Sequence, residues 1–170
     1  GLMKDYGANA TGYQYLYDVR RDAHPSAQAA VTYKVVDTWH LLKEPKDVRL
    51  RVNLLSPPGE VILAHGDPPR NKPGNPKNLR YILLPNNTGD STFVSVLEPY
   101  VGARTISKIE RKDDGGTVTI TVTTASGRID TIVSAMKPIK AKIAGVDFEG
   151  RFGVISSENG KASAKLEVKE

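Results

Sequence analysis

The chain contains no cysteine among its 170 residues. This absence excludes disulfide bonds, cysteine-based zinc sites and thiol nucleophiles, although it does not identify a cellular compartment. No stretch approaches the roughly 20 consecutive apolar residues that a membrane-spanning helix requires, so we expect no transmembrane helix. No basic segment followed by an apolar run opens the sequence, and we therefore expect no secretion signal within these residues.

Aromatic residues are also scarce, at 6% of the chain, with a single tryptophan. Few aromatic rings argue against a dedicated surface for stacking sugars or single-stranded nucleic acid. The net charge of +5 is a modest basic excess, compatible with an acidic partner such as a polyanionic polysaccharide. We expect neither nucleic acid nor a membrane as partner, and composition alone does not indicate what the protein does.

Strict alternation of apolar and polar residues marks the clearest predicted strands. Apolar side chains occupy every second position of residues 48–54, while Arg49 and Arg51 share the opposite face. Residues 117–123 repeat this pattern with β-branched side chains almost throughout, which suits a sheet with one solvated face. Further strands are expected at residues 13–19, 28–36, 61–64, 79–83 and 92–97, and no window shows an apolar stripe at helical spacing.

Turn residues divide these segments. Asp-Asp-Gly-Gly at 113–116, Ser126-Gly127 and Asn159-Gly160 each separate two predicted strands, because glycine tolerates the positive φ of tight hairpin turns. The sequence therefore predicts an all-β fold, an antiparallel β-sandwich of about a dozen short strands. We expect a single domain over residues 1–170, with the main sheets in residues 1–136. Residues 137–170 would supply closing strands, because they are too few for a core of their own.

Each histidine has an ordinary structural alternative to a functional role. His65 is followed by Gly-Asp at a predicted strand end, which would suit an acid/base or binding role, but the spacing matches no metal-binding signature. The alternative is a surface histidine. His40 follows Trp39, where packing is the simpler interpretation, and His24 lies in a predicted loop.

Basic residues form the more suggestive set. Arginine guanidinium groups bind carboxylate and sulfate through paired hydrogen bonds. Arg70 lies in a long proline-rich loop predicted at residues 66–76, which could border a binding surface. We predict Arg49, Arg51, His65, Arg70 and Arg80 as substrate-binding residues, the alternative being a solvated sheet face. The alternating Tyr13, Tyr15 and Tyr17 could stack on sugars, although core packing or cross-strand contacts explain them more simply.

No sequence motif indicates catalysis. The chain has no Gly-x-Ser-x-Gly nucleophile elbow, no glycine-rich phosphate loop ending in Lys-Ser or Lys-Thr, and no Gly-x-Gly-x-x-Gly that opens a helix. The neighbouring carboxylates Asp113 and Asp114 belong to a predicted turn, where solvation explains them better than glycoside hydrolysis. We assign no catalytic residue, no metal site and no cofactor.

Six segments carry a combined resemblance to a known family. They are residues 12–21, Trp39, and residues 48–54, 60–66, 91–100 and 146–154. The most specific is Ser-Thr-Phe-Val-Ser-Val-Leu-Glu-Pro-Tyr at 91–100. Together these segments resemble the C-terminal β-sheet region of heparinase II/III-like polysaccharide lyases, and the resemblance spans nearly the whole chain.

The resemblance implies a fragment of a larger periplasmic or extracellular protein. Members of the family pair an α/α toroid with a β-sandwich and cleave uronic-acid-containing polysaccharides by β-elimination. Elimination requires a base for the C5 proton and a group that neutralises the uronate, and the toroid that normally supplies them is missing from these residues. We therefore expect a non-catalytic portion that packs on the toroid and shapes the acidic-glycan cleft. The alternative is an autonomous carbohydrate-binding module for acidic glycans.

Overall fold

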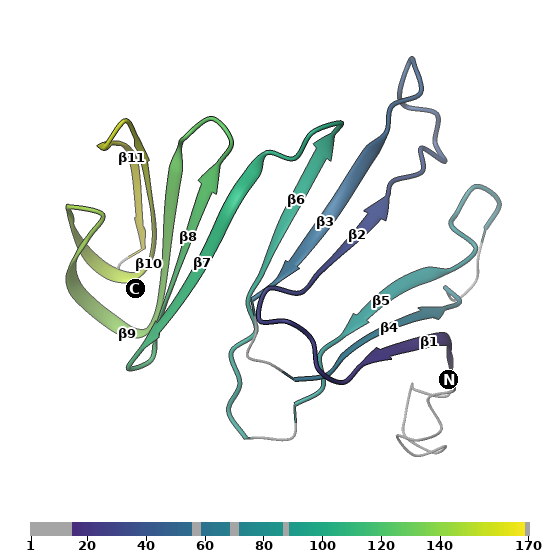
Figure 1. The fold of residues 1–170 in the computed structure, drawn as a ribbon, viewed down its shortest axis with the longest axis horizontal. Coiled ribbons are helices and arrows are strands. Elements are labelled where there is room, and N and C mark those ends of the chain that lie inside the picture. Colours follow the sequence, from purple (N-terminus) through teal and green to yellow (C-terminus); the bar gives the residue numbers. More distant parts are fainter. Residues whose placement is uncertain (1–14, 56–58, 69–71, 87–88, 169–170) are drawn as a thin grey trace. The chain divides into compact units, whose positions relative to one another are not determined.

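A computed structural model describes residues 15–55, 59–68, 72–86 and 89–168. Eleven β-strands lie within these residues and form three antiparallel sheets (Figure 1). None of the described residues belongs to a helix long and apolar enough to cross a membrane. The prediction of an all-β, antiparallel sandwich fold is confirmed.

The backbone divides into two compact units, Gly1–Pro99 and Tyr100–Glu170. The sequence suggests a boundary near Met136, but this residue lies inside a continuous strand, β9 (Ile129–Ile143). Pro138 does not interrupt this strand, because the ladder between β9 and β8 (Thr117–Thr124) ends at Ala135, before the proline. Residues 137–168 belong to the same sheet as residues 106–124. That the two units make one domain stays a prediction.

The N-terminal unit contains two three-stranded sheets. One has the order β1-β4-β5 and consists of β1 (Leu16–Asp22), β4 (Val61–Gly66) and β5 (Leu79–Leu83). The other has the order β2-β3-β6 and consists of β2 (Ala30–Lys34), β3 (Val48–Leu54) and β6 (Ser95–Val101). The last residues of β6 carry the chain into the C-terminal unit.

Alternation in β4 separates a core face from an outer face. Ile62 and Ala64 are buried and form a small core with Val19 of β1, against which Tyr81 of β5 packs. Gly66 continues this face, and a Cβ atom there would lie 2.9 Å from Cε2 of Tyr81, so glycine makes room for the tyrosine ring. His65, between Ala64 and Gly66, therefore points to the outer face of the sheet.

The predicted strand at residues 48–54 is confirmed, but its last polar residue is not solvated. The alternation places Asn53 on the same face as Arg49 and Arg51, but Asn53 is only 7% exposed. Its Nδ2 donates a hydrogen bond to the carbonyl oxygen of Val96 in β6 (3.2 Å), and Arg51 Nε donates to its Oδ1 (3.0 Å). These partners offset the cost of burying the amide.

The C-terminal unit is one five-stranded meander with the order β11-β10-β9-β8-β7. Its remaining strands are β7 (Ile106–Asp114), β10 (Val146–Glu158) and β11 (Lys161–Val168). The predicted hairpin turn at Asn159-Gly160 is confirmed, with φ values of 50° and 75°. A second turn of this kind, Ala144-Gly145 with φ values of 48° and 79°, joins β9 to β10 and was not anticipated.

The β9–β10 hairpin extends beyond its neighbours and buries Phe148. Between the pairs Gly150–Ile139 and Phe152–Ser134, one residue of β10 faces four residues of β9, so the extra residues of this irregularity lie in β9. The ring of Phe148, only 3% exposed, packs on Gly153 farther along the same strand, where a Cβ atom would lie 2.3 Å from Cε2 of the ring. The absence of a side chain at Gly153 therefore allows the outer half of the hairpin to close onto the sheet.

Candidate functional site

A cluster of ionisable and aromatic side chains lies on the outer face of the β1-β4-β5 sheet. We call Tyr17, Asp18, His65, Asp67 and Arg80 the polar cluster. His65 stands directly opposite Tyr17 of β1 and opposite Arg80 of β5. Opposed residues of antiparallel strands project from the same face, so strand pairing brings these three side chains together.

A bulge in β1 adds a carboxylate to this face. The register between β1 and β4 shifts between Tyr17 and Arg20, and Asp18 has a left-handed φ of 51°. Successive strand residues normally point to opposite faces, but here both Tyr17 and Asp18 reach His65. The Tyr17 and His65 rings meet edge to face with centroids 5.8 Å apart, and Asp18 Oδ2 lies 3.3 Å from His65 Nδ1. Backbone strain and bulges of this kind often accompany functional sites.

His65 Nδ1 faces two groups with opposite requirements. Besides the Asp18 carboxylate, Nη1 of Arg80 lies 3.4 Å from the same nitrogen. When Nδ1 carries a proton it can donate to Asp18, and when it carries none it can accept from Arg80. The presence or absence of a proton on Nδ1 therefore decides which neighbour this nitrogen engages, and when Nδ1 donates to Asp18 the Arg80 guanidinium is available to another acceptor.

The Tyr17 hydroxyl is held in its protonated form. It donates a hydrogen bond of 2.8 Å to Asp67 Oδ1. This bond, with smaller contributions from desolvation and from the Asp67 charge, raises the pKa of Tyr17 above its ordinary value, although Asn78 and Arg80 act in the opposite direction. A phenol in this setting is suited to hydrogen bonding and poorly suited to abstracting a proton.

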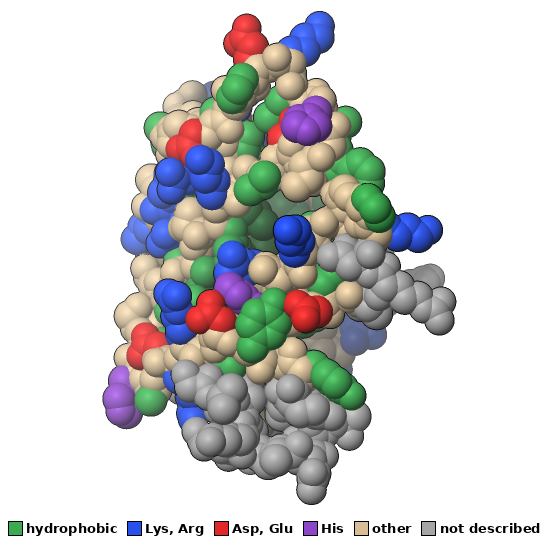
Figure 2. Space-filling view, turned by 90° about the vertical axis from the view of Figure 1, so that its right-hand side faces the viewer, with side chains coloured by type: hydrophobic (Ala, Val, Ile, Leu, Met, Phe, Trp, Pro, Cys, Tyr) green, Lys and Arg blue, Asp and Glu red, His purple; other side chains and the backbone are tan. Residues whose placement is uncertain are grey.

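The polar cluster is accessible to a ligand. Arg80 is exposed, and the His65 side chain retains 18% of its surface exposed. Figure 2 shows one face of the molecule, on which histidine, acidic, basic and apolar side chains lie close together. The Arg80 charge also reaches Tyr33 of β2, where it partly opposes the rise in the Tyr33 pKa that burial causes.

The other predicted binding residues lie elsewhere. Arg49 and Arg51 belong to β3 in the second sheet, where they stand opposite Lys34 and Thr32 of β2. Arg49 Nε donates to Asp47 Oδ2 (3.0 Å), and Arg51 Nη1 donates to Thr32 Oγ1 (3.3 Å). Arg70 lies outside the described residues. The structure thus brings His65 and Arg80 together and places Arg49 and Arg51 in a separate basic row.

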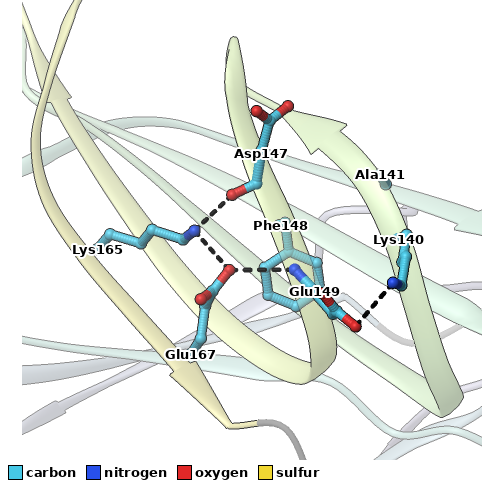
Figure 3. A pocket seen from close by; sticks show the side chains of 7 residues that line it. All are labelled: Lys140, Ala141, Asp147, Phe148, Glu149, Lys165 and Glu167. Carbon is cyan, nitrogen blue, oxygen red and sulfur yellow. Dashed lines mark hydrogen bonds and ion pairs between the residues drawn. The ribbon is translucent and has the colours of Figure 1, made fainter.

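A second candidate is a cleft of about 540 Å³ in the C-terminal unit (Figure 3). Its lining residues come from β9, β10 and β11: Lys140, Ala141, Asp147, Phe148, Glu149, Lys165 and Glu167. Lys140 Nζ lies 3.1 Å from Glu149 Oε1, and Lys165 Nζ lies 2.6 Å from Glu167 Oε1. These charges neutralise one another within the cleft, and Phe148 below them is buried.

Two of the cleft residues act as a structural clasp. Glu167 Oε1 accepts a hydrogen bond from the backbone nitrogen of Glu149 (3.1 Å), and Lys165 Nζ donates to the carbonyl oxygen of Asp147. Side chains of β11 thereby fasten the outer half of the β9–β10 hairpin. We interpret the cleft as part of this closure, because its ionic groups serve contacts within the unit.

No family model matches the chain, and no curated protein or solved structure shows significant similarity to it. The polar cluster therefore has to be interpreted from its own chemistry. Within the described residues, no three His, Cys, Asp or Glu side chains gather in a way that could hold a metal ion.

Sequence reasoning identified His65 and Arg80 but missed three members of the polar cluster. The sequence places the Asp67 carboxylate close to His65, but in the structure Asp67 accepts a hydrogen bond from Tyr17, and Asp18 is the carboxylate beside His65. The alternation of Tyr13, Tyr15 and Tyr17 was the sequence feature that pointed to Tyr17. Its ring contacts His65 of the neighbouring strand, and a cross-strand contact is one of the two simpler explanations that the sequence favoured. No local signal marked Asp18, because its position depends on the bulge.

Proposed function

We propose that this chain is a non-catalytic β-sandwich portion of a heparinase II/III-like polysaccharide lyase, contributing one wall of a cleft for acidic glycans. The proposal is supported by the resemblance of six segments to that family and by the all-β fold. The lyase of which it is part would act on uronic-acid-containing polysaccharide in the periplasm or outside the cell.

The exposed guanidinium of Arg80 beside His65 is the observation that carries the proposal. A carboxylate or sulfate group placed against Arg80 can accept two parallel hydrogen bonds, and the adjacent imidazole adds a third donor when protonated. The Tyr17 hydroxyl on the same face can contact sugar hydroxyl groups through its remaining lone pairs.

The same geometry favours binding over catalysis. β-Elimination needs a side chain that accepts the C5 proton. Tyr17 is held protonated by Asp67, and His65 Nδ1 lies between a carboxylate and a guanidinium. The cluster has hydrogen-bond donors for an anion but no group prepared as a strong base, so the base and acid would come from the catalytic domain.

The decisive experiment compares the 170-residue chain with a longer polypeptide that contains it. Both are incubated with heparan sulfate, chondroitin sulfate and alginate, and formation of unsaturated uronate is followed by ultraviolet absorbance. We expect product only with the longer polypeptide, and Arg80→Ala there should raise KM by about tenfold, as loss of one charge-assisted contact predicts. Arg128→Ala, which removes an exposed arginine of the C-terminal unit, is the matched control. Turnover by the chain alone, or none by the longer polypeptide, would contradict the proposal.

The basic row on the second sheet favours one alternative, an autonomous carbohydrate-binding module. Lys34, Arg49 and Arg51 share one face of the β2–β3 pair. This alternative requires the isolated chain to bind acidic glycans as tightly as the longer polypeptide does, with an affinity that falls as salt rises, since exposed charges are screened. Isothermal titration calorimetry at two salt concentrations tests it, and undetectable binding at low salt would rule it out.

A further inference from the structure

The loop between β2 and β3 presents the only tryptophan of the chain to solvent. Trp39 is 65% exposed, and its neighbours Val36 and Leu41 are 71% and 81% exposed. An indole costs free energy when it is left in water, so an exposed tryptophan on an ordered loop calls for an explanation.

Hydrogen bonds within the loop hold it in a defined conformation. Asp37 accepts hydrogen bonds from the backbone nitrogens of Leu41 (3.0 Å) and Leu42 (2.8 Å). These bonds lower the pKa of the Asp37 carboxyl, so it is ionised at neutral pH. The backbone nitrogen of Thr38 donates to the carbonyl oxygen of Val36 (2.9 Å), and His40 adopts a left-handed φ of 52°. A side chain on such a preorganised loop loses little conformational entropy when a ligand binds.

The segment that carries the tryptophan has a small basic excess, with four basic and three acidic side chains over residues 34–49. Lys34, Lys43 and Lys46 are exposed in or beside the loop. The carboxylate of Asp37 is turned onto the loop backbone, and Asp47 is engaged by Arg49 at 3.0 Å. Glu44 is the other exposed acid of this segment. With Asp47 paired to Arg49, three exposed lysines stand against the carboxylates of Asp37 and Glu44, and this excess of one positive charge favours an anionic ligand over a cationic one.

We propose that Trp39 is a stacking residue for a pyranose ring of an acidic glycan, with the neighbouring lysines contacting the carboxylate or sulfate groups of that glycan. The C–H face of a pyranose is apolar and weakly electropositive, and it complements the electronegative face of an indole ring. This inference rests on the proposed function and adds a second contact point, on the other sheet of the unit from the polar cluster.

The test uses Trp39 as its own reporter, because the chain has no other tryptophan. The 170-residue chain is titrated at low salt with hexasaccharides of alginate and chondroitin sulfate, with maltohexaose as the uncharged control. We expect a saturable change in tryptophan emission with the acidic sugars. In calorimetry, Trp39→Ala should weaken binding by about tenfold, and Trp39→Phe, which keeps a flat ring, should lose less.

Leu41→Ala is the matched control variant, since it removes an even more exposed apolar side chain from the same loop without removing a ring. Binding that leaves Trp39 emission unchanged, or that survives Trp39→Ala, would overturn the stacking role while leaving the proposed function intact. Equal losses in Trp39→Ala and Leu41→Ala would also overturn it, because the indole ring would then contribute no more than another apolar side chain of the loop. Circular dichroism checks that each variant retains its sheet structure.

Discussion

The contact between Gly153 and Phe148 gives the sharpest stability prediction. In Gly153→Ala the new methyl group would lie 2.3 Å from Phe148 Cε2, which is 1.1 Å closer than the shortest ordinary contact of 3.4 Å. It would also lie 2.8 Å from the carbonyl oxygen of Leu166 in the adjacent strand. The ring is buried and the carbonyl belongs to the backbone, so neither can move away without loss of packing.

We expect Gly153→Ala to lower the free energy of unfolding by about 2 kcal/mol, within the usual 1–3 kcal/mol range for overpacking. In urea this corresponds to a shift of the unfolding midpoint by about 1 M, for a slope near 2 kcal/mol per M. Circular dichroism at equilibrium measures it. Gly89→Ala is the control, because nothing lies within 4 Å of its added methyl group.

A double-mutant cycle tests the assigned cause. Phe148→Ala alone should cost about 3–5 kcal/mol, as removal of a buried phenylalanine usually does. If the clash with the ring is the main cost, Gly153→Ala should be less harmful in the Phe148→Ala background than in the native chain. Strictly additive losses, or an unchanged midpoint for Gly153→Ala alone, would refute this reasoning.

Three further predictions concern hydrogen bonds. The raised pKa of Tyr17 means that its hydroxyl stabilises the fold at pH values below the pKa of an unfolded phenol. This stabilisation is lost as pH rises through the pKa of Tyr17 in the folded protein. Asp67→Asn removes the main cause of the rise, so phenolate absorbance should appear at lower pH. The pKa of Asp37 is lowered, so the stabilisation that its carboxylate provides is lost as pH falls through the pKa of Asp37 in the folded protein. Asp37→Ala should speed amide hydrogen exchange at Leu41 and Leu42, whose backbone nitrogens donate to this carboxylate. Lys165→Met should lower the free energy of unfolding by about 1 kcal/mol in urea titrations and speed proteolysis near Ala144.

Local patterns were sufficient to predict the strands and several turns. The β-branched alternation of residues 117–123 predicts β8, because side chains of this kind pack well on a pleated surface. Asn159-Gly160 predicts the β10–β11 turn, since both residue types tolerate a positive φ. Ala144 lacks that tolerance, so its φ of 48° reflects the pairing of two long strands and could not be recognised locally.

The candidate site depended on contacts that local patterns do not encode. His65 and Arg80 meet because β4 and β5 pair in one particular register across the intervening loop. The place of Asp18 depends on a bulge whose φ of 51° is unfavourable for most residues. The sequence suggested a boundary near Pro138, but β7 to β11 form one sheet and β9 runs through this position. The proline is tolerated there because the pairing of β9 with β8 ends before it.

The contacts of Lys165 and Glu167 have a consequence for solubility. Among the described residues, no strand pairs with the outer edge of β10 over residues 146–151, where unsatisfied peptide groups would invite another chain to add a strand. Two of these peptide groups already have side-chain partners. The Lys165 ammonium donates to the carbonyl oxygen of Asp147, and the Glu167 carboxylate accepts a hydrogen bond from the backbone nitrogen of Glu149. A polypeptide at high concentration would have to displace both ionic contacts before it could extend this sheet, so the hairpin carries its own protection against edge-to-edge aggregation.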